Sequence, residues 1–112
     1  MKEPFSISAL EEALGVDGAQ EIIESFLEDS SGLLNMIEEA ILTRDKEFLR
    51  SNCHKLSGCY RAIGANDGYQ LSSALETYAT QQNWSAVASL LSEFKDSYEL
   101  IAVSAKRYLN GA

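Results

Sequence analysis

Pro4 is the only proline in this chain of 112 residues, so the 108 residues that follow it contain no proline to break a helix. The aliphatic side chains are mostly unbranched at Cβ, with 14 Leu and 13 Ala against three Val and three Thr. Unbranched side chains lose little rotamer freedom in a helix, whereas β-branched side chains favour strands. The sequence therefore predicts an all-α protein, and its length fits a single domain covering residues 1–112.

Apolar residues recur at spacings of three and four along most of the chain, which is the pattern of amphipathic helices. Gly15 and Gly64 are placed to end helices, Asp45 is placed to begin one, and Ser30–Gly32 is a point where the longest helix could bend. Four long helices joined by short turns pack as an antiparallel up-and-down bundle, which a short first helix would cap. The expected helices cover residues 8–14, 19–43 and 45–63, with a fourth beginning near 66 or 67 and a fifth after 83.

The charge of the chain limits its partners. Nine basic residues against 17 acidic ones give a net charge of −8, which disfavours binding to nucleic acid or to an anionic membrane. No stretch of about 18 apolar residues is present to insert into a membrane, and the N-terminus lacks the apolar core of a signal peptide. We therefore expect a cytoplasmic protein, and a monomer. Cys53 and Cys59 would lie roughly 10 Å apart on one helix, too far for a disulfide, so both are expected to be free thiols.

The only histidine, His54, lies in a basic part of this acidic chain. Residues 48–66 contain no acid, but they contain Arg50, Lys55 and Arg61. On a helical wheel, His54 points away from the apolar stripe of its helix, so its imidazole is expected to be exposed. The residues that share its face are Arg50, Ser51, Ser57, Gly58 and Arg61.

Gly58 and Glu76 add to the candidate site around His54. A glycine inside a helix costs about 0.5–1 kcal/mol relative to alanine, and at Gly58 it leaves a notch one turn after His54. His54 lies 11 residues before Ala65, at the expected turn, and Glu76 lies 11 residues after it. Equal offsets place two residues at the same height in an antiparallel helix pair. Glu76 is therefore expected to face Nδ1 of His54 and to hold one tautomer, with Nε2 free.

These residues suit phosphoryl transfer through histidine. A neutral imidazole is an available nucleophile at neutral pH, and cations and hydroxyls can stabilise a phosphoryl group bound to it. The sequence has no phosphate-binding loop for ATP. The domain would therefore be a carrier and not an enzyme, with no cofactor of its own, and a partner would supply both the phosphoryl group and Mg²⁺.

The motif His54-Lys55-Leu56-Ser57-Gly58, followed by Gly64-Ala65 and Leu75-Glu76, resembles the signature of histidine-containing phosphotransfer (HPt) domains of bacterial phosphorelays. That signature reads H-x-L-K-G, with G-A ten and eleven residues after the histidine and L-E at twenty-one and twenty-two. The resemblance spans essentially the whole chain. It departs from the family at Ser57, where a lysine is usual, and at Gly68, where a leucine is common and where the glycine could loosen the first turn of its helix.

The resemblance implies a role for each matching residue. His54 would accept a phosphoryl group from the aspartate of one receiver domain and pass it to another, and Glu76 would orient the imidazole. Gly58 would let the receiver approach, while Lys55 and Arg61 would compensate for the lysine that Ser57 replaces. Apolar residues near the N-terminus either form a docking patch or, as we favour for most of them, bury the capping helix: Ile7, Leu10, Leu14 and Ile22.

Other interpretations stay open at the level of sequence. The chain could be a scaffold with an incidental histidine, or a domain that an ATP-binding histidine kinase phosphorylates directly. A metal site formed by Cys53, His54 and Cys59 is disfavoured, because Cys53 and Cys59 point about 120° apart and no second histidine exists. The chain could also be the end of a hybrid sensor kinase and not a free-standing carrier.

Overall fold

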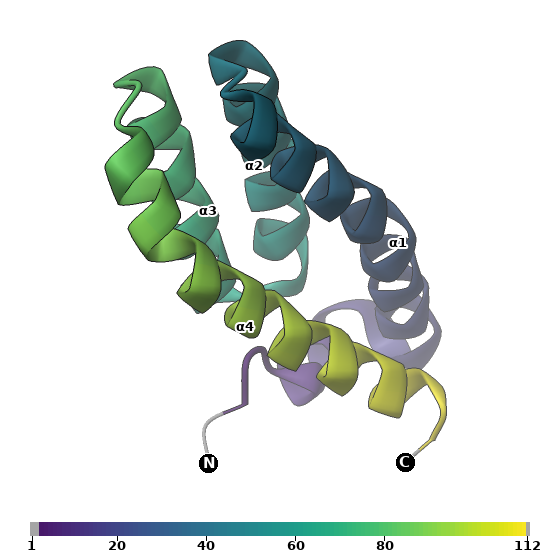
Figure 1. Ribbon diagram of the computed structural model, residues 1–112. Coiled ribbons are helices and arrows are strands. Elements are labelled where there is room, and N and C mark those ends of the chain that lie inside the picture. The colour runs from purple at the N-terminus through teal and green to yellow at the C-terminus, as the bar shows by residue number, and fades with distance from the viewer. Residues whose placement is uncertain (1–2, 112) are drawn as a thin grey trace.

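The computed structural model describes residues 3–111, which form four helices and no strand. Each helix contacts its two neighbours around the bundle, in the order α1, α2, α3, α4 and back to α1. Turns of two or three residues join successive helices, which therefore run in opposite directions (Figure 1). This confirms the antiparallel four-helix bundle predicted from the sequence. The helices are α1 (Ile7–Thr43), α2 (Lys46–Ile63), α3 (Asn66–Thr80) and α4 (Trp84–Leu109).

Polar side chains and glycines set the ends of the helices where the sequence predicted them. The Asp45 carboxylate accepts a hydrogen bond from the backbone N–H of Phe48, so Asp45 is the N-cap of α2. Asn83 caps α4 in the same way. Gly64 ends α2 with a φ of +75°, in the left-handed region that glycine enters without a steric penalty.

A kink at Gly15 divides α1 into a short capping segment and a long helix. Gly15 has a φ of +77° and is the only residue of α1 with a non-helical backbone, so the predicted short helix does end there. The long part resumes at Val16, three residues earlier than predicted. It continues without a break through Ser30–Gly32, because Ser30 is buried and bonds to the Tyr98 hydroxyl at 2.9 Å.

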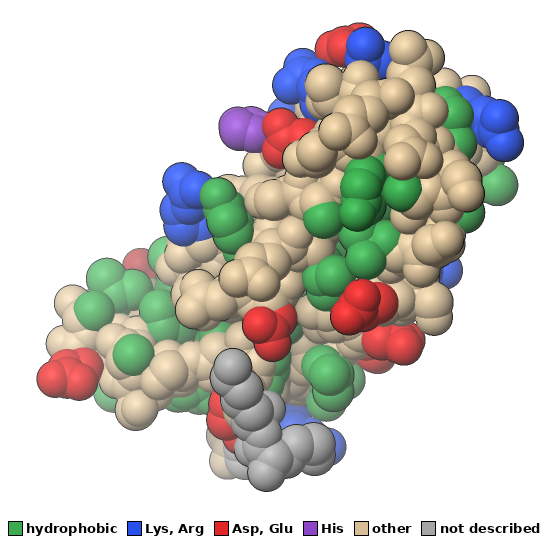
Figure 2. Space-filling view, turned by 90° about the vertical axis from the view of Figure 1, so that its left-hand side faces the viewer, with side chains coloured by type: hydrophobic (Ala, Val, Ile, Leu, Met, Phe, Trp, Pro, Cys, Tyr) green, Lys and Arg blue, Asp and Glu red, His purple; other side chains and the backbone are tan. Residues whose placement is uncertain are grey.

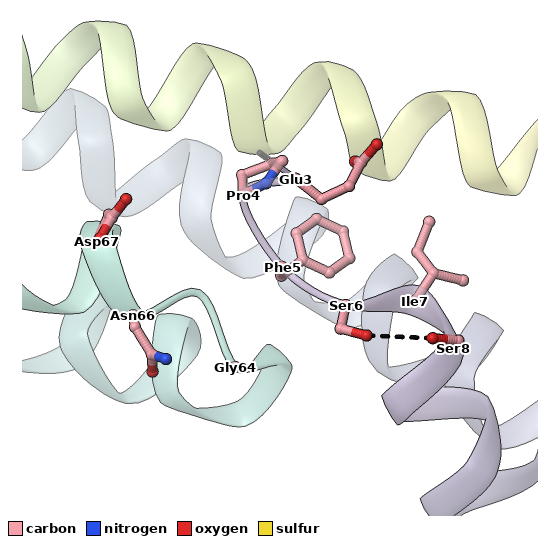
Figure 3. Close-up of a pocket in the computed structure, with 9 residues that line it drawn as sticks. All are labelled: Glu3, Pro4, Phe5, Ser6, Ile7, Ser8, Gly64, Asn66 and Asp67. Carbon is pink, nitrogen blue, oxygen red and sulfur yellow. Dashed lines mark hydrogen bonds between the residues drawn. The ribbon is translucent and has the colours of Figure 1, made fainter. Parts of the chain in front are cut away.

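The capping segment and the residues before it close one end of the bundle. Phe5 is buried in the core, and Ile7, Leu10 and Ile22 pack against that core, whereas Leu14 is 47% exposed. Most of the apolar residues considered for a docking patch therefore bury the capping helix. An open hollow remains between this segment and the α2–α3 turn (Figure 3), lined by Glu3, Pro4, Phe5, Ser6, Ile7, Ser8, Gly64, Asn66 and Asp67.

Gly68 provides space for the largest fully buried side chain, Tyr60. A Cβ atom at Gly68 would lie only 2.7 Å from Cε1 of Tyr60, so a side chain cannot be added there without moving the ring. That Gly68 loosens the first turn of α3 stays a prediction; the structure shows that the glycine lets α2 and α3 approach closely. The Tyr60 ring also packs against Phe26 of α1, with ring centroids 5.8 Å apart.

Candidate functional site

His54 projects from α2 into solvent. Its side chain is 73% exposed, while its neighbours Cys53 and Leu56 face the core and are fully buried. Figure 2 shows the imidazole standing out from the surface, with an acidic side chain beside it and basic side chains on either side. The predicted outward orientation of the imidazole is confirmed.

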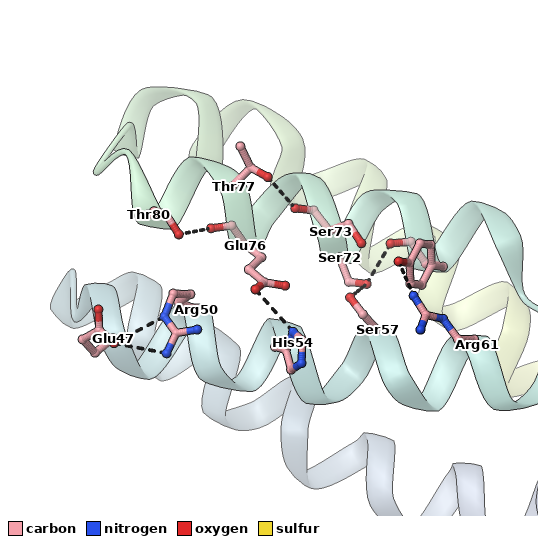
Figure 4. A network of polar contacts seen from close by, with 11 residues as sticks. Glu47, Arg50, His54, Ser57, Arg61, Ser72, Ser73, Glu76, Thr77 and Thr80 are labelled. Atoms are coloured by element: carbon pink, nitrogen blue, oxygen red, sulfur yellow. Dashed lines mark hydrogen bonds and ion pairs between the residues drawn. The ribbon is translucent and has the colours of Figure 1, made fainter.

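Glu76 of α3 faces the imidazole across the groove between α2 and α3 (Figure 4). Its Oε2 atom lies 3.4 Å from Nδ1 of His54, and its side chain is 26% exposed. This distance is longer than that of a strong hydrogen bond, so the pair is an electrostatic contact. Among the described residues, Nε2 has no polar partner. The contact predicted from equal offsets about the α2–α3 turn is present.

The three cations of α2 nearest His54 in the sequence have different surroundings. Arg50 pairs with Glu47 of its own helix at 3.3 Å, so a carboxylate already neutralises part of its charge. Lys55 is exposed and has no carboxylate within ion-pair distance in residues 3–111. Arg61 contacts Tyr69 of α3 in two ways: its Nη2 atom donates to the phenol oxygen, and its guanidinium lies 4.8 Å from the ring centroid.

The helical wheel predicted that Ser57 lies beside His54 on the exposed face, and the structure shows that it does not. It is 5% exposed, and its Oγ atom lies 2.7 Å from Oγ of Ser72 in the interface between α2 and α3. Ser57 points about 60° away from His54 around the helix, and α3 covers that direction. Its hydroxyl is therefore not available to a phosphoryl group on the surface.

Two other residues of the predicted face remain accessible. Gly58 is exposed, and a Cβ atom built on it would meet nothing within 4 Å. Ser51 is half-buried, one turn before His54. The notch at Gly58 therefore separates His54 from Arg61 along the surface of α2.

The cysteines of α2 do not join the imidazole. Cys53 faces the core, where burial, followed by the charge of Glu76, raises the pKa of its thiol to about 12. Burial also raises the pKa of Cys59. Within residues 3–111, no three His, Cys, Asp or Glu side chains are grouped to hold a metal ion.

A search of the same residues for a membrane span gave none, because every helix is too short or too polar to cross a bilayer.

Ser72 and Tyr69 were not predicted from the sequence as part of this region. A signal for Tyr69 was present, because Arg61 lies four residues before Ala65 and Tyr69 lies four residues after it. These are equal offsets of the kind that predicted the contact between His54 and Glu76. Ser72 had no such signal, since a buried serine pair has no distinctive spacing.

Comparisons with known proteins agree with the fold. The family model of the Hpt domain matches residues 21–103. The crystal structure of histidine-containing phosphotransfer protein B (HptB) from Pseudomonas aeruginosa PAO1 has the same fold, with a TM-score of 0.84 over 95% of this chain and 91% of that chain, at 19% sequence identity. No curated protein matches the sequence significantly. Because the family model covers most of the bundle, including α2 and α3, this chain belongs to the Hpt domain family.

Proposed function

We propose that His54 is the phosphoryl acceptor through which this Hpt domain acts as a phosphorelay intermediary, taking the group from one receiver domain and passing it to another. The family makes the chain a phosphocarrier in a phosphorelay, not an enzyme. The observation that carries the assignment of His54 is the orientation of its ring. Nδ1 faces the Glu76 carboxylate, while Nε2 lies on a side chain that is 73% exposed.

The transfer step follows from that orientation. Nε2 attacks the phosphorus of a phosphoaspartate, a P–N bond forms, and the P–O bond to the aspartate breaks, with the carboxylate as leaving group. The imidazole keeps its proton on Nδ1 and gains positive charge as the new bond forms. Glu76 faces that proton and stabilises the developing charge, as the carboxylate of a catalytic triad does for its histidine. Transfer to the next receiver reverses these changes.

Groups on α2 can stabilise the phosphoryl group once it is bound. Lys55 follows His54 directly and has no competing carboxylate among the described residues, so its ammonium can reach the phosphoryl oxygens. Arg50 and Ser51 lie one turn before His54 and can donate to the same oxygens. Gly58 leaves open surface on the other side, where the backbone of a receiver can approach. Ser57 has no part in this proposal.

The remaining requirements are assigned to the partner. Receiver domains and kinases are the partners that the family implies. We propose that the receiver supplies Mg²⁺, that the domain neither binds ATP nor carries a cofactor of its own, and that it acts as a monomer in the cytoplasm. A histidine kinase that phosphorylates His54 directly would use the same imidazole, so the experiment must separate the two phosphoryl donors.

The test is incubation of the purified domain with Mg²⁺ and each of a set of phosphorylated receivers. We expect acid-labile, base-stable labelling of the wild type by at least one receiver, and no labelling of His54→Gln. The matched control is Lys106→Gln, which changes an exposed residue of α4 outside the proposed site. Labelling only with a kinase and ATP would favour the direct route. A wild type that accepts phosphoryl from no donor would favour a scaffold.

A further inference from the structure

Arg61 occupies a distinctive position relative to His54. It lies seven residues further along α2, on the same face, about 10.5 Å along the helix axis. Gly58 lies between them and has no side chain, so the surface from the imidazole to the guanidinium is open. A phosphoryl group on Nε2 extends only a few ångströms from the ring, whereas the Arg61 guanidinium bonds to the hydroxyl of Tyr69 on α3 and stacks on its ring.

Among the cations near His54 in residues 3–111, Arg61 alone is both held in place and not neutralised by a carboxylate. Arg50 is held in place by a carboxylate, Glu47, and Lys55 is not held by any described side chain. Arg61 is held by Tyr69, whose aromatic ring and hydroxyl fix the guanidinium without supplying a negative charge. A rigid, fully charged cation at the edge of an open surface is suited to pair with an anion on another molecule.

We propose that Arg61 is a docking cation that pairs with a carboxylate on the receiver, about two helical turns from the phosphoryl group, and that Tyr69 positions it. This inference rests on the proposed function, since it takes the receiver as the partner. The charge distribution supports it: residues 48–66 contain no acid in a chain whose net charge is −8, so a carboxylate on the partner is attracted to this stretch, and a fixed cation within it selects the register in which the partner binds.

Tyr69 is a positioning residue in this proposal because it acts through Arg61. The ring and the hydroxyl contribute separately, so variants can separate them. Tyr69→Phe keeps the face on which the guanidinium stacks and removes only the hydrogen bond. Tyr69→Leu removes both contacts and leaves the Arg61 side chain free to sample many rotamers.

The experiment measures transfer from a phosphorylated receiver, one that labels the wild type, as a function of receiver concentration at low ionic strength. Phosphoramidate serves as a second donor, because a small molecule reaches His54 without a docking surface. The variants are Arg61→Glu, Tyr69→Phe and Tyr69→Leu. Arg107→Glu is the matched control, since it makes the same charge change on an exposed residue of α4. Circular dichroism verifies that each variant is folded.

We expect Arg61→Glu to raise the half-saturating concentration of the phosphorylated receiver roughly fivefold to tenfold, with the maximal single-turnover rate constant within a factor of two. Added salt should reduce this difference. Tyr69→Leu should show a smaller rise, Tyr69→Phe the smallest, and phosphoramidate labelling should be the same in all variants. Equal half-saturating receiver concentrations for Arg61→Glu and Arg107→Glu would overturn the inference. A loss of phosphoramidate labelling in Arg61→Glu would also overturn it, because Arg61 would then act on the imidazole. A wild type that phosphoramidate labels but no receiver labels would instead contradict the proposed function.

Discussion

The hydroxyl groups of Ser57 and Ser72 are joined by a buried hydrogen bond of 2.7 Å between α2 and α3. Ser72 donates its own proton to the carbonyl oxygen of Tyr69, so Ser57 is the donor to Ser72. The bond lies one turn from His54 on α2 and one turn from Glu76 on α3. It therefore fixes the separation of the two helices next to the pair on which the proposed chemistry depends.

Removing one partner of this bond should destabilise the bundle. Ser72→Ala leaves the Ser57 hydroxyl buried without an acceptor, and we expect the free energy of unfolding to fall by about 1–3 kcal/mol. Urea denaturation measures the change, and Ser92→Ala, at an exposed position of α4, is the control. If the two variants were equally stable, the buried bond would contribute nothing to the folded state.

The two glycines inside α2 and α3 should respond in opposite ways to alanine. Gly58→Ala adds a methyl group in open space and improves helix propensity, so it should raise the free energy of unfolding by up to about 1 kcal/mol. Gly68→Ala places the methyl group against the Tyr60 ring and should lower it by about 1–3 kcal/mol. Thermal and urea denaturation measure both, and changes of the same sign would contradict the packing described for Tyr60.

The buried thiol of Cys53 should make stability depend on alkaline pH. Its pKa rises from an ordinary value of 9.0 to about 12 on folding, so the folded protein holds this proton more tightly than the unfolded chain does. The stabilisation is complete below pH 9 and is lost as pH rises toward 12, by roughly 1.4 kcal/mol for each pH unit.

The variant Cys53→Ala lacks this contribution. We therefore expect the stability advantage of the wild type over Cys53→Ala to shrink by roughly 2 kcal/mol between pH 8 and 10.5. Urea denaturation in the presence of a reducing agent measures it at both pH values. A constant difference between the two proteins would mean that the thiol does not titrate differently in the folded and unfolded states.

Glu76 should affect both the tautomer of His54 and the rate of transfer. Glu76→Gln keeps an oxygen that can face Nδ1 but loses the charge, and we expect a roughly tenfold slower single-turnover transfer; Glu76→Leu loses both and should be slower by roughly a hundredfold. Nitrogen-15 NMR of the imidazole should show less proton on Nδ1 in the leucine variant. Glu99→Gln, which makes the same change at an exposed position of α4, is the control. An unchanged tautomer in Glu76→Leu would show that the carboxylate does not set it.

Local signals in the sequence predicted the fold well. Asp45 and Asn83 begin helices because their side chains accept hydrogen bonds that the first turn leaves unpaired, and Gly64 ends one because it adopts a positive φ. The helix that could bend at Ser30–Gly32 has a regular helical backbone there, and Ser30, which weakens a helix locally, gains a buried bond to Tyr98. That bond depends on a residue 68 positions away, which no local pattern reveals.

The sequence predicted the contact in the candidate site that depends on equal offsets about the α2–α3 turn. It did not predict the features that depend on how neighbouring helices pack against α2. The equal offsets of His54 and Glu76 from a short turn predicted their contact, because two antiparallel helices with the same rise per residue place such residues at the same height. A wheel drawn for α2 alone cannot say how much of its surface α1 and α3 cover. It therefore placed Ser57 outside, although α3 buries it, and it gave no reason for the close approach at Gly68.

The most direct test of His54 as the phosphoryl acceptor is to identify the atom to which the phosphorus is bonded. Phosphorus–nitrogen correlation in NMR of the phosphorylated, ¹⁵N-labelled domain, kept at alkaline pH where phosphohistidine is stable, identifies the bonded atom. The orientation of the ring predicts one phosphorus bonded to Nε2 of His54, with the proton on Nδ1 facing Glu76. Phosphorus bonded to Nδ1, or to an oxygen of any other residue, would contradict it.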